Sequence, residues 1–134
     1  MLNKKRLKNL LSLKQKELFN QKIEISTLDN EFRKNKTNKK KLKEILENTL
    51  IENTETAFDI KEKSQYKIKL TEQMYISDNR EKFLNIELIR AKKNLGKLIK
   101  EKDLVNRKIE MVSKLESKAK ENNFINSMPP PKNS

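Results

Sequence analysis

The feature that most constrains the fold is a set of apolar residues at spacings that alternate between four and three. In the second half of the chain, nine of eleven such positions are apolar, although only 34% of all residues are. These positions are Leu84, Leu88, Ala91, Leu95, Leu98, Lys102, Val105, Ile109, Val112, Glu116 and Ala119. The alternation is typical of a coiled-coil seam, because it keeps one narrow apolar stripe of a helix against a partner helix.

The first half of the chain repeats this spacing, and eight of its twelve positions are apolar. They are Leu7, Leu11, Lys14, Leu18, Gln21, Ile25, Leu28, Phe32, Asn35, Lys39, Leu42 and Leu46. Two seams in a chain of 134 residues suggest that the chain folds back on itself. We therefore expect an all-α protein, a long antiparallel two-helix coiled-coil hairpin. An intermolecular dimer in which each chain is one long helix is the alternative.

Glycine and proline are nearly absent, which favours long helices with few turns. The chain has one glycine, Gly96, and its three prolines are residues 129–131, whereas a fold with many turns needs both residue types. The high charged fraction of 38% is also typical of disordered chains. The apolar spacing argues against disorder, because a disordered chain has no reason to keep one phase over five heptads.

The expected domain plan is a single coiled-coil domain over residues 1–123 and a mobile, proline-containing tail over 124–134. Within the domain we expect a helix over 4–60, a short helical or irregular tip over 61–78, and a helix over 79–122. Asn3 is the expected N-cap of the first helix.

The position of the reversal stays open between two breaks. The apolar spacing is lost between residues 49 and 80, where Thr, Asn and Ser are frequent. One candidate break is 53–56. The other is 77–79, where Asp78 and Glu81 form a possible capping box at the start of the second helix.

The composition also argues against catalysis. The chain contains no cysteine and no histidine, so it lacks thiol chemistry, the commonest general base and the commonest transition-metal ligand. No phosphate-binding loop or nucleophile motif is present. We expect no enzyme activity, no cofactor and no metal site. Because no apolar run reaches the roughly 18 residues needed to span a bilayer, we expect a cytoplasmic protein.

The net charge of +13 raises the alternative of a basic coiled-coil scaffold that binds nucleic acid or an anionic membrane. Its strongest segment is residues 33–43, with seven basic side chains and no acidic one. However, only five of the 32 basic residues are arginine, and the charge is spread along the chain. We therefore do not expect nucleic acid as the partner.

Aromatic and methionine residues in the part without a seam are candidates for a partner surface, since such side chains are common at the centres of interfaces. They are Phe58, Tyr66, Met74 and Tyr75. Local packing is the alternative for the same residues.

The two ends of the chain resemble the FliJ-type flagellar and type III export proteins. Near the start, the residues that carry the resemblance are Leu7, Leu10, Leu11, Leu13, Lys14 and Glu17. Near the end, Leu95-Gly96-Lys97-Leu98 is similar to the Leu-Glu-Lys-Leu core of that family's C-terminal helix. Gly96 departs from the family, which has an acidic residue there, and it weakens the helix by about 1 kcal/mol relative to alanine.

The resemblance implies a non-enzymatic stalk protein that is cytoplasmic and peripheral at the inner-membrane export apparatus, held there only through its partners. The paired termini of such a protein enter the ring of the export ATPase hexamer. Its opposite end reaches the cytoplasmic domain of the export gate, and it also assists export chaperones. Whether the system is flagellar or of the injectisome type stays open.

Carried onto this sequence, the resemblance assigns two groups of partner-binding residues. The ATPase end would contain Lys4, Lys5, Arg6, Leu7, Leu11, Lys114, Lys118 and Lys120. The gate-facing tip would contain Phe58, Tyr66, Met74 and Tyr75.

Overall fold

The protein is all-helical over the residues that the structure, a computed structural model, describes, namely 3–49 and 56–127. Helix α1 runs over Lys4–Asn48 and helix α2 over Ala57–Ser127. No strand occurs in these two ranges. The all-α expectation is therefore confirmed for the described residues.

Both helix starts are capped by side chains. The Asn3 Oδ1 atom accepts a hydrogen bond from the Lys5 amide at 3.0 Å, which confirms Asn3 as the N-cap of α1. At the start of α2, the Asp59 amide donates to Thr56 Oγ1 at 3.2 Å, and the Thr56 amide donates to Asp59 Oδ2 at 3.3 Å. This reciprocal pair is a capping box with aspartate in the place of glutamate.

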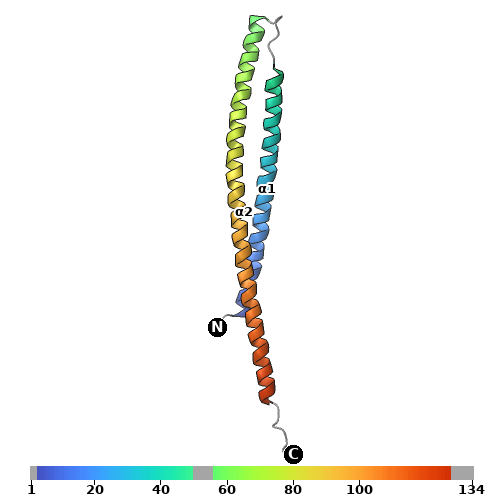
Figure 1. Cartoon of the computed structure of the whole chain (residues 1–134), viewed down its shortest axis with the longest axis vertical. Coiled ribbons are helices and arrows are strands. Elements are labelled where there is room, and N and C mark those ends of the chain that lie inside the picture. Colours follow the sequence, from blue (N-terminus) through green and yellow to red (C-terminus); the bar gives the residue numbers. More distant parts are fainter. Residues whose placement is uncertain (1–2, 50–55, 128–134) are drawn as a thin grey trace, which may run out of the picture. The chain divides into compact units, whose positions relative to one another are not determined.

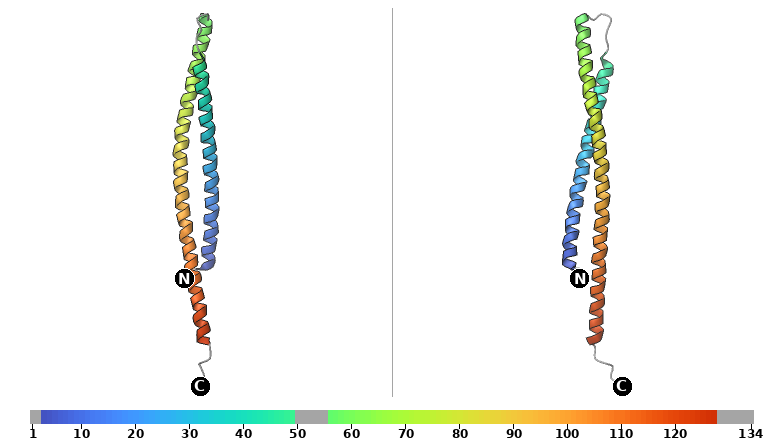
Figure 2. Two further views of the ribbon diagram at one scale, coloured as in Figure 1. Left: turned by 45° about the vertical axis from the view of Figure 1, so that its right-hand side comes forward. Right: turned by 90° about the vertical axis from the view of Figure 1, so that its left-hand side faces the viewer.

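The chain divides into two compact units, and both helices contribute to each. Unit 1 comprises Met1–Gln21 and Asn94–Ser134, and unit 2 comprises Lys22–Lys93. Within each unit α1 and α2 lie side by side (Figure 1, Figure 2).

The helices run antiparallel in both units, as the pairs of contacting residues show. In unit 1, Lys14 contacts Glu101 and Gln21 contacts Asn94. In unit 2, Glu31 contacts Arg80 and Asn35 contacts Ser77. In each unit the residue number on α2 falls as that on α1 rises.

Burial follows the four-three spacing. All twelve predicted seam positions of α1 are buried or half-buried. On α2 the predicted seam positions from Leu84 to Val112 are also buried or half-buried, whereas Glu116 and Ala119 are exposed. These last two positions lie beside the first residues of α1, where only Asn3 and Lys4 are near enough to line a groove with them.

The predicted helix bounds are wrong in the middle of the chain. Helix α1 ends at Asn48 rather than 60, and the expected tip, residues 61–78, lies inside α2. The spacing continues there without its apolar character, and the half-buried or buried positions in this phase are Lys63, Lys67, Leu70, Met74, Ser77 and Glu81. Four of these six residues are polar or charged, which is why an apolar pattern did not reveal the seam.

The predicted breaks and tail also need correction. Asp78 and Glu81 do not cap a helix; both contact Lys39 of α1 from within α2. Of the other break, residues 53–55 lie outside the described residues, and Thr56 is the cap of α2. Helix α2 continues past 122 to Ser127, so the first part of the predicted mobile tail is helical. The rest of that tail, 128–134, is outside the described residues.

Candidate partner-binding surfaces

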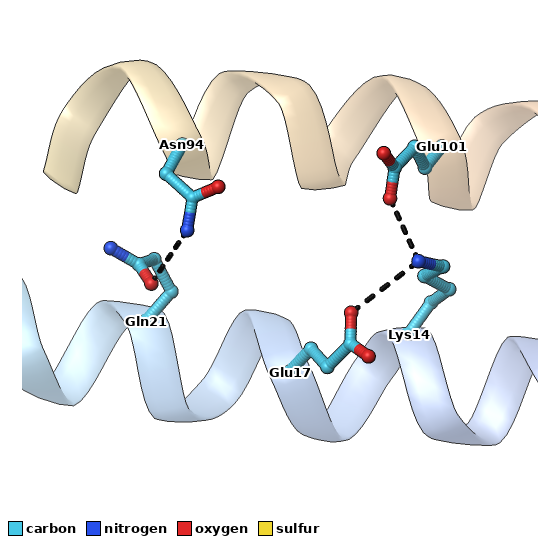
Figure 3. Close-up of polar contacts among 5 residues, drawn as sticks. All are labelled: Lys14, Glu17, Gln21, Asn94 and Glu101. Atoms are coloured by element: carbon cyan, nitrogen blue, oxygen red, sulfur yellow. Dashed lines mark hydrogen bonds and ion pairs between the residues drawn. The ribbon is translucent and has the colours of Figure 1, made fainter. Parts of the chain in front are cut away.

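A charged pair lies at the edge of the seam in unit 1 (Figure 3). The Lys14 Nζ atom is 2.8 Å from Glu101 Oε2 of α2 and 3.4 Å from Glu17 Oε2 of its own helix. The hydrogen bond to Glu101 raises the pKa of Lys14, and the same bond lowers the pKa of Glu101. Lysine at this seam position is accommodated because its charge reaches a carboxylate across the helix pair.

A neutral polar pair follows two turns further along α1 in the same unit. The Asn94 Nδ2 atom donates to Gln21 Oε1 at 3.0 Å, and Figure 3 shows the two amides facing each other. Gln21 is buried. A buried amide costs free energy unless it is hydrogen-bonded, so this pair favours the register in which both residues meet.

Unit 2 contains a second neutral pair, between Asn35 and Ser77. The Asn35 Nδ2 atom donates to the Ser77 carbonyl oxygen at 2.9 Å, and the Ser77 Oγ atom donates to Asn35 Oδ1 at 3.0 Å. Ser77 is buried. Three of the four polar residues in the α1 seam, namely Lys14, Gln21 and Asn35, therefore have polar partners on α2.

The fourth polar seam residue of α1, Lys39, is held between two carboxylates of α2. Its Nζ atom contacts Asp78 and lies 3.2 Å from Glu81 Oε2. The hydrogen bond to Asp78, followed by the one to Glu81, raises the pKa of Lys39. These polar contacts favour one pairing of residues across the two helices. A surface for a partner protein must therefore be formed by side chains outside the seam.

Part of the predicted ATPase end faces inward. Leu7 is buried and Leu11 is half-buried in the seam of unit 1, so these two leucines pack against α2 and do not form an exposed surface. Lys4 is half-buried and its Nζ atom is 3.2 Å from Glu116 Oε2. Lys5 and Arg6 are exposed.

The predicted residues of α2 in unit 1 are all exposed, but they do not share one face. Lys114 and Lys118 are four residues apart and lie on the same side of the helix. Lys120 is six residues from Lys114, which at about 100° per residue places it on another side. Every residue from 114 to 127 is exposed.

An apolar groove lies next to this basic surface and was not predicted from the sequence. Its volume is about 570 Å³. Its lining residues are Asn3, Lys4, Lys108, Met111, Val112, Leu115, Glu116 and Ala119. Met111 and Leu115 are exposed large apolar residues. Each directly precedes a seam position, so a search for a second apolar stripe beside the seam would have identified them.

The structure does not bring the predicted gate-facing residues together. Met74 is half-buried at a seam position, so it faces α1. Phe58, Tyr66 and Tyr75 are exposed. Tyr66 and Tyr75 are nine residues apart, which places them on opposite sides of α2 at about 100° per residue. These residues therefore do not form one surface.

The described residues contain no group of three or more histidine, cysteine, aspartate or glutamate side chains that could hold a metal ion. Neither of the two described helices is long and apolar enough to cross a membrane. No protein-family model, curated protein or solved structure matches the chain.

Proposed function

We propose that the chain is a non-enzymatic stalk and chaperone-escort component of a flagellar or related type III protein export apparatus, which binds and stimulates the export ATPase. The proposal includes the finer fold, an antiparallel coiled-coil hairpin. Burial at the four-three positions of both helices supports the hairpin. The resemblance of both ends of the sequence to FliJ-type proteins supports the function.

The observation that carries the proposal is the composition of the exposed surface near the end of α2 in unit 1. The groove that contains Met111 and Leu115 is apolar, and Lys114 and Lys118 lie beside it. The basic residues around the groove outnumber its acidic ones, Glu110, Glu116 and Glu121. Apolar side chains with such a rim are suited to a protein partner of complementary charge. Leu7 and Leu11 are better assigned to the helix pair than to the partner.

Stimulation would follow from differential binding. A helical protein that contacts one nucleotide state of the ATPase ring more strongly than the others shifts the ring toward that state. In the same proposal, the exposed Phe58, Tyr66 and Tyr75 remain candidates for the export gate, each as a separate contact.

The test is a titration of the chain into the purified export ATPase of the same genome, with phosphate release as the readout. We expect the chain to stimulate phosphate release. The double variant Lys114→Glu with Lys118→Glu should need an about tenfold higher concentration for the same stimulation, since reversed rim charges repel a complementary partner. Leu115→Ser should weaken it independently. All three positions are exposed, so the helical far-UV signal should not change.

The matched control is Lys36→Glu combined with Lys40→Glu, which reverses two exposed charges at the same four-residue spacing in unit 2. These lysines line a groove with Arg33 and Lys43, the specific feature that favours the nucleic-acid or anionic-membrane alternative. The export proposal would be replaced by that alternative if two results were found together. The chain would fail to stimulate the ATPase, and it would bind DNA or anionic vesicles in a salt-sensitive way that the Lys36→Glu and Lys40→Glu variant abolishes.

A further inference from the structure

A second apolar stripe runs along the exposed side of α2 within unit 2. It again alternates four-residue and three-residue spacings, and we call it the outer stripe. Its ten positions are Phe58, Lys61, Gln65, Ile68, Glu72, Tyr75, Asn79, Lys82, Ile86 and Ile89. Its five apolar members have exposed fractions from 57% to 69%.

The outer stripe points away from α1. Each of its members lies two residues before a position in the seam phase of α2, as Ile68 precedes Leu70 and Ile86 precedes Leu88. At about 100° per residue, that offset places the stripe nearly opposite the seam. An ordered apolar stripe on an exposed side is the usual mark of a helix that packs against a further helix.

One charged pair of the outer stripe is complementary when the stripe is read in reverse. Reversal about residue 77 places Glu72 opposite Lys82, Ile68 opposite Ile86 and Tyr75 opposite Asn79. Neither Glu72 nor Lys82 has an ion-pair partner among the described parts of the chain. A two-fold axis would form the Glu72–Lys82 pair twice and the Ile68–Ile86 contact twice, because such an interface repeats each contact.

We infer that the outer stripe of α2 is a self-association surface on which a second copy of this chain docks antiparallel, with Glu72 of each copy paired to Lys82 of the other. A different protein whose surface carries charge of one sign would attract either Glu72 or Lys82 and repel the other. A second copy matches both. The like-charged Lys61 and Lys93 meet only at the two ends of this overlap, where both side chains are exposed to solvent.

The stripe is long enough for a specific interface. Reversal about residue 77 pairs residues 61–93 of one copy with those of the other, a length of about 48 Å, and leaves Phe58 outside the overlap. A specific protein interface usually buries about 800 Å² on each partner, so the two helices have to pack along most of this length. The surface lies wholly in unit 2, so it does not use the groove of unit 1. The stripe shares Phe58 and Tyr75 with the gate candidates of the proposed function, but the dimer test uses no export component.

The test measures the dimer dissociation constant of the full chain by analytical ultracentrifugation. We expect a monomer–dimer equilibrium for the wild-type chain. Glu72→Lys alone, or Lys82→Glu alone, should raise the dimer dissociation constant about tenfold, because each change places two pairs of like charges across the interface. The double variant Glu72→Lys with Lys82→Glu should restore the affinity. An equimolar mixture of the two single variants should form a heterodimer more readily than either variant dimerises.

A second comparison uses two exposed isoleucines of the same helix. Ile86→Ser removes an outer-stripe residue and should weaken the dimer about tenfold or more, as expected for loss of a buried isoleucine. Ile125→Ser is the matched control, since Ile125 is a similarly exposed isoleucine of the same helix and lies far from the stripe. Circular dichroism of each variant verifies that the helices remain folded.

Two results would overturn the inference. One is a monomer at every concentration of the folded wild-type chain, which would leave a different protein as the occupant of the stripe. The other is a dimer whose dissociation constant is the same in wild type, Glu72→Lys and Ile86→Ser, which would place the interface elsewhere.

Discussion

Lys14 illustrates how a single charged residue takes part in the seam. Its position belongs to the apolar phase of α1, yet its ammonium group reaches Glu101 of α2 and Glu17 of its own helix. Gln21, Asn35 and Lys39 have their own polar partners on α2. A residue that interrupts an apolar pattern can therefore contribute to pairing, because its polar atoms have a defined partner in only one register.

The Lys14–Glu101 pair leads to a prediction about pH. The pKa of Glu101 is lowered in the folded protein, so the pair stabilises the fold above the ordinary glutamate pKa of 4.5 and this contribution is lost as pH falls through the lowered value. The pKa of Lys14 is raised, so the contribution persists below 10.5 and is lost as pH rises through the raised value. We expect a small stabilisation between these limits, since both groups are partly solvated.

The measurement compares wild type with Glu101→Gln by urea unfolding from pH 3 to pH 8. The wild type should be more stable at pH 7, and the difference should shrink as the pH falls below 4.5 through the lowered pKa of Glu101. Glu110→Gln removes an exposed glutamate of the same helix and serves as the control. A constant difference across the pH range for Glu101→Gln would show that the pair makes no charge-dependent contribution.

At the scale of the element, α2 is a helix of 71 residues that contains a single glycine. Gly96 has a negative φ angle, and a Cβ atom placed there would meet no other heavy atom within 4 Å. Glycine lowers helix stability because it retains more backbone freedom in the unfolded chain. The surroundings of Gly96 therefore leave room for a side chain at this position.

We therefore expect Gly96→Ala to stabilise the protein by about 1 kcal/mol, the difference in helix propensity between the two residues. Urea unfolding followed by far-UV circular dichroism measures the change. Gly96→Ser is a graded control, and its effect should lie between those of glycine and alanine. Destabilisation by alanine would mean that a close neighbour approaches this position in solution.

The same element explains why the helix bounds were mispredicted. Residues 63–81 keep the seam phase with lysine, serine and glutamate at four of six positions, so the apolar signal is lost while the helix continues. Ser77 and Asp78 have high preferences for helix caps, but here they hydrogen-bond or pair with Asn35 and Lys39. Contacts with α1 outweigh the local preference of these residues.

At the scale of the whole molecule, burial is distributed unevenly along the described chain. Buried apolar residues of α2 extend from Leu70 to Val105, and Leu84 is buried most completely. By contrast, every residue from 114 to 127 is exposed. Helical segments with few buried side chains open with a lower free energy than those that carry the core.

We expect amide hydrogen exchange to follow this distribution. Amides of residues 84–105 should exchange most slowly, and those of 118–127 should exchange at least about a hundredfold faster, because opening there exposes no core. Exchange followed by NMR or by mass spectrometry of peptides measures the profile at neutral pH. Equal protection in both segments would show that 118–127 are covered in solution, for example by another copy of the chain.

The candidate surfaces were predictable only in part. The sequence identified exposed lysines near the end of α2, and the structure leaves Lys114, Lys118 and Lys120 exposed. The spacing placed Leu7 and Leu11 in the seam, where they are buried or half-buried, whereas the resemblance also assigned them to the partner surface. Met74, a candidate for the partner surface, is half-buried against α1, because an apolar residue in a four-three pattern can serve either the helix partner or an external one. Which of the two applies depends on where the other helix lies.

The sequence by itself determined that the chain is helical over its two predicted seams, residues 7–46 and 84–112, and which side of the helix is buried there. The physical reason is that burial of a narrow apolar stripe requires a period near 3.5 residues, which can be read without coordinates. Only the tertiary structure decided where α1 ends, how far α2 continues and which polar residues meet across the seam. These features depend on contacts between residues far apart in the chain, such as Lys14 with Glu101 and Asn35 with Ser77, and no local pattern contains them.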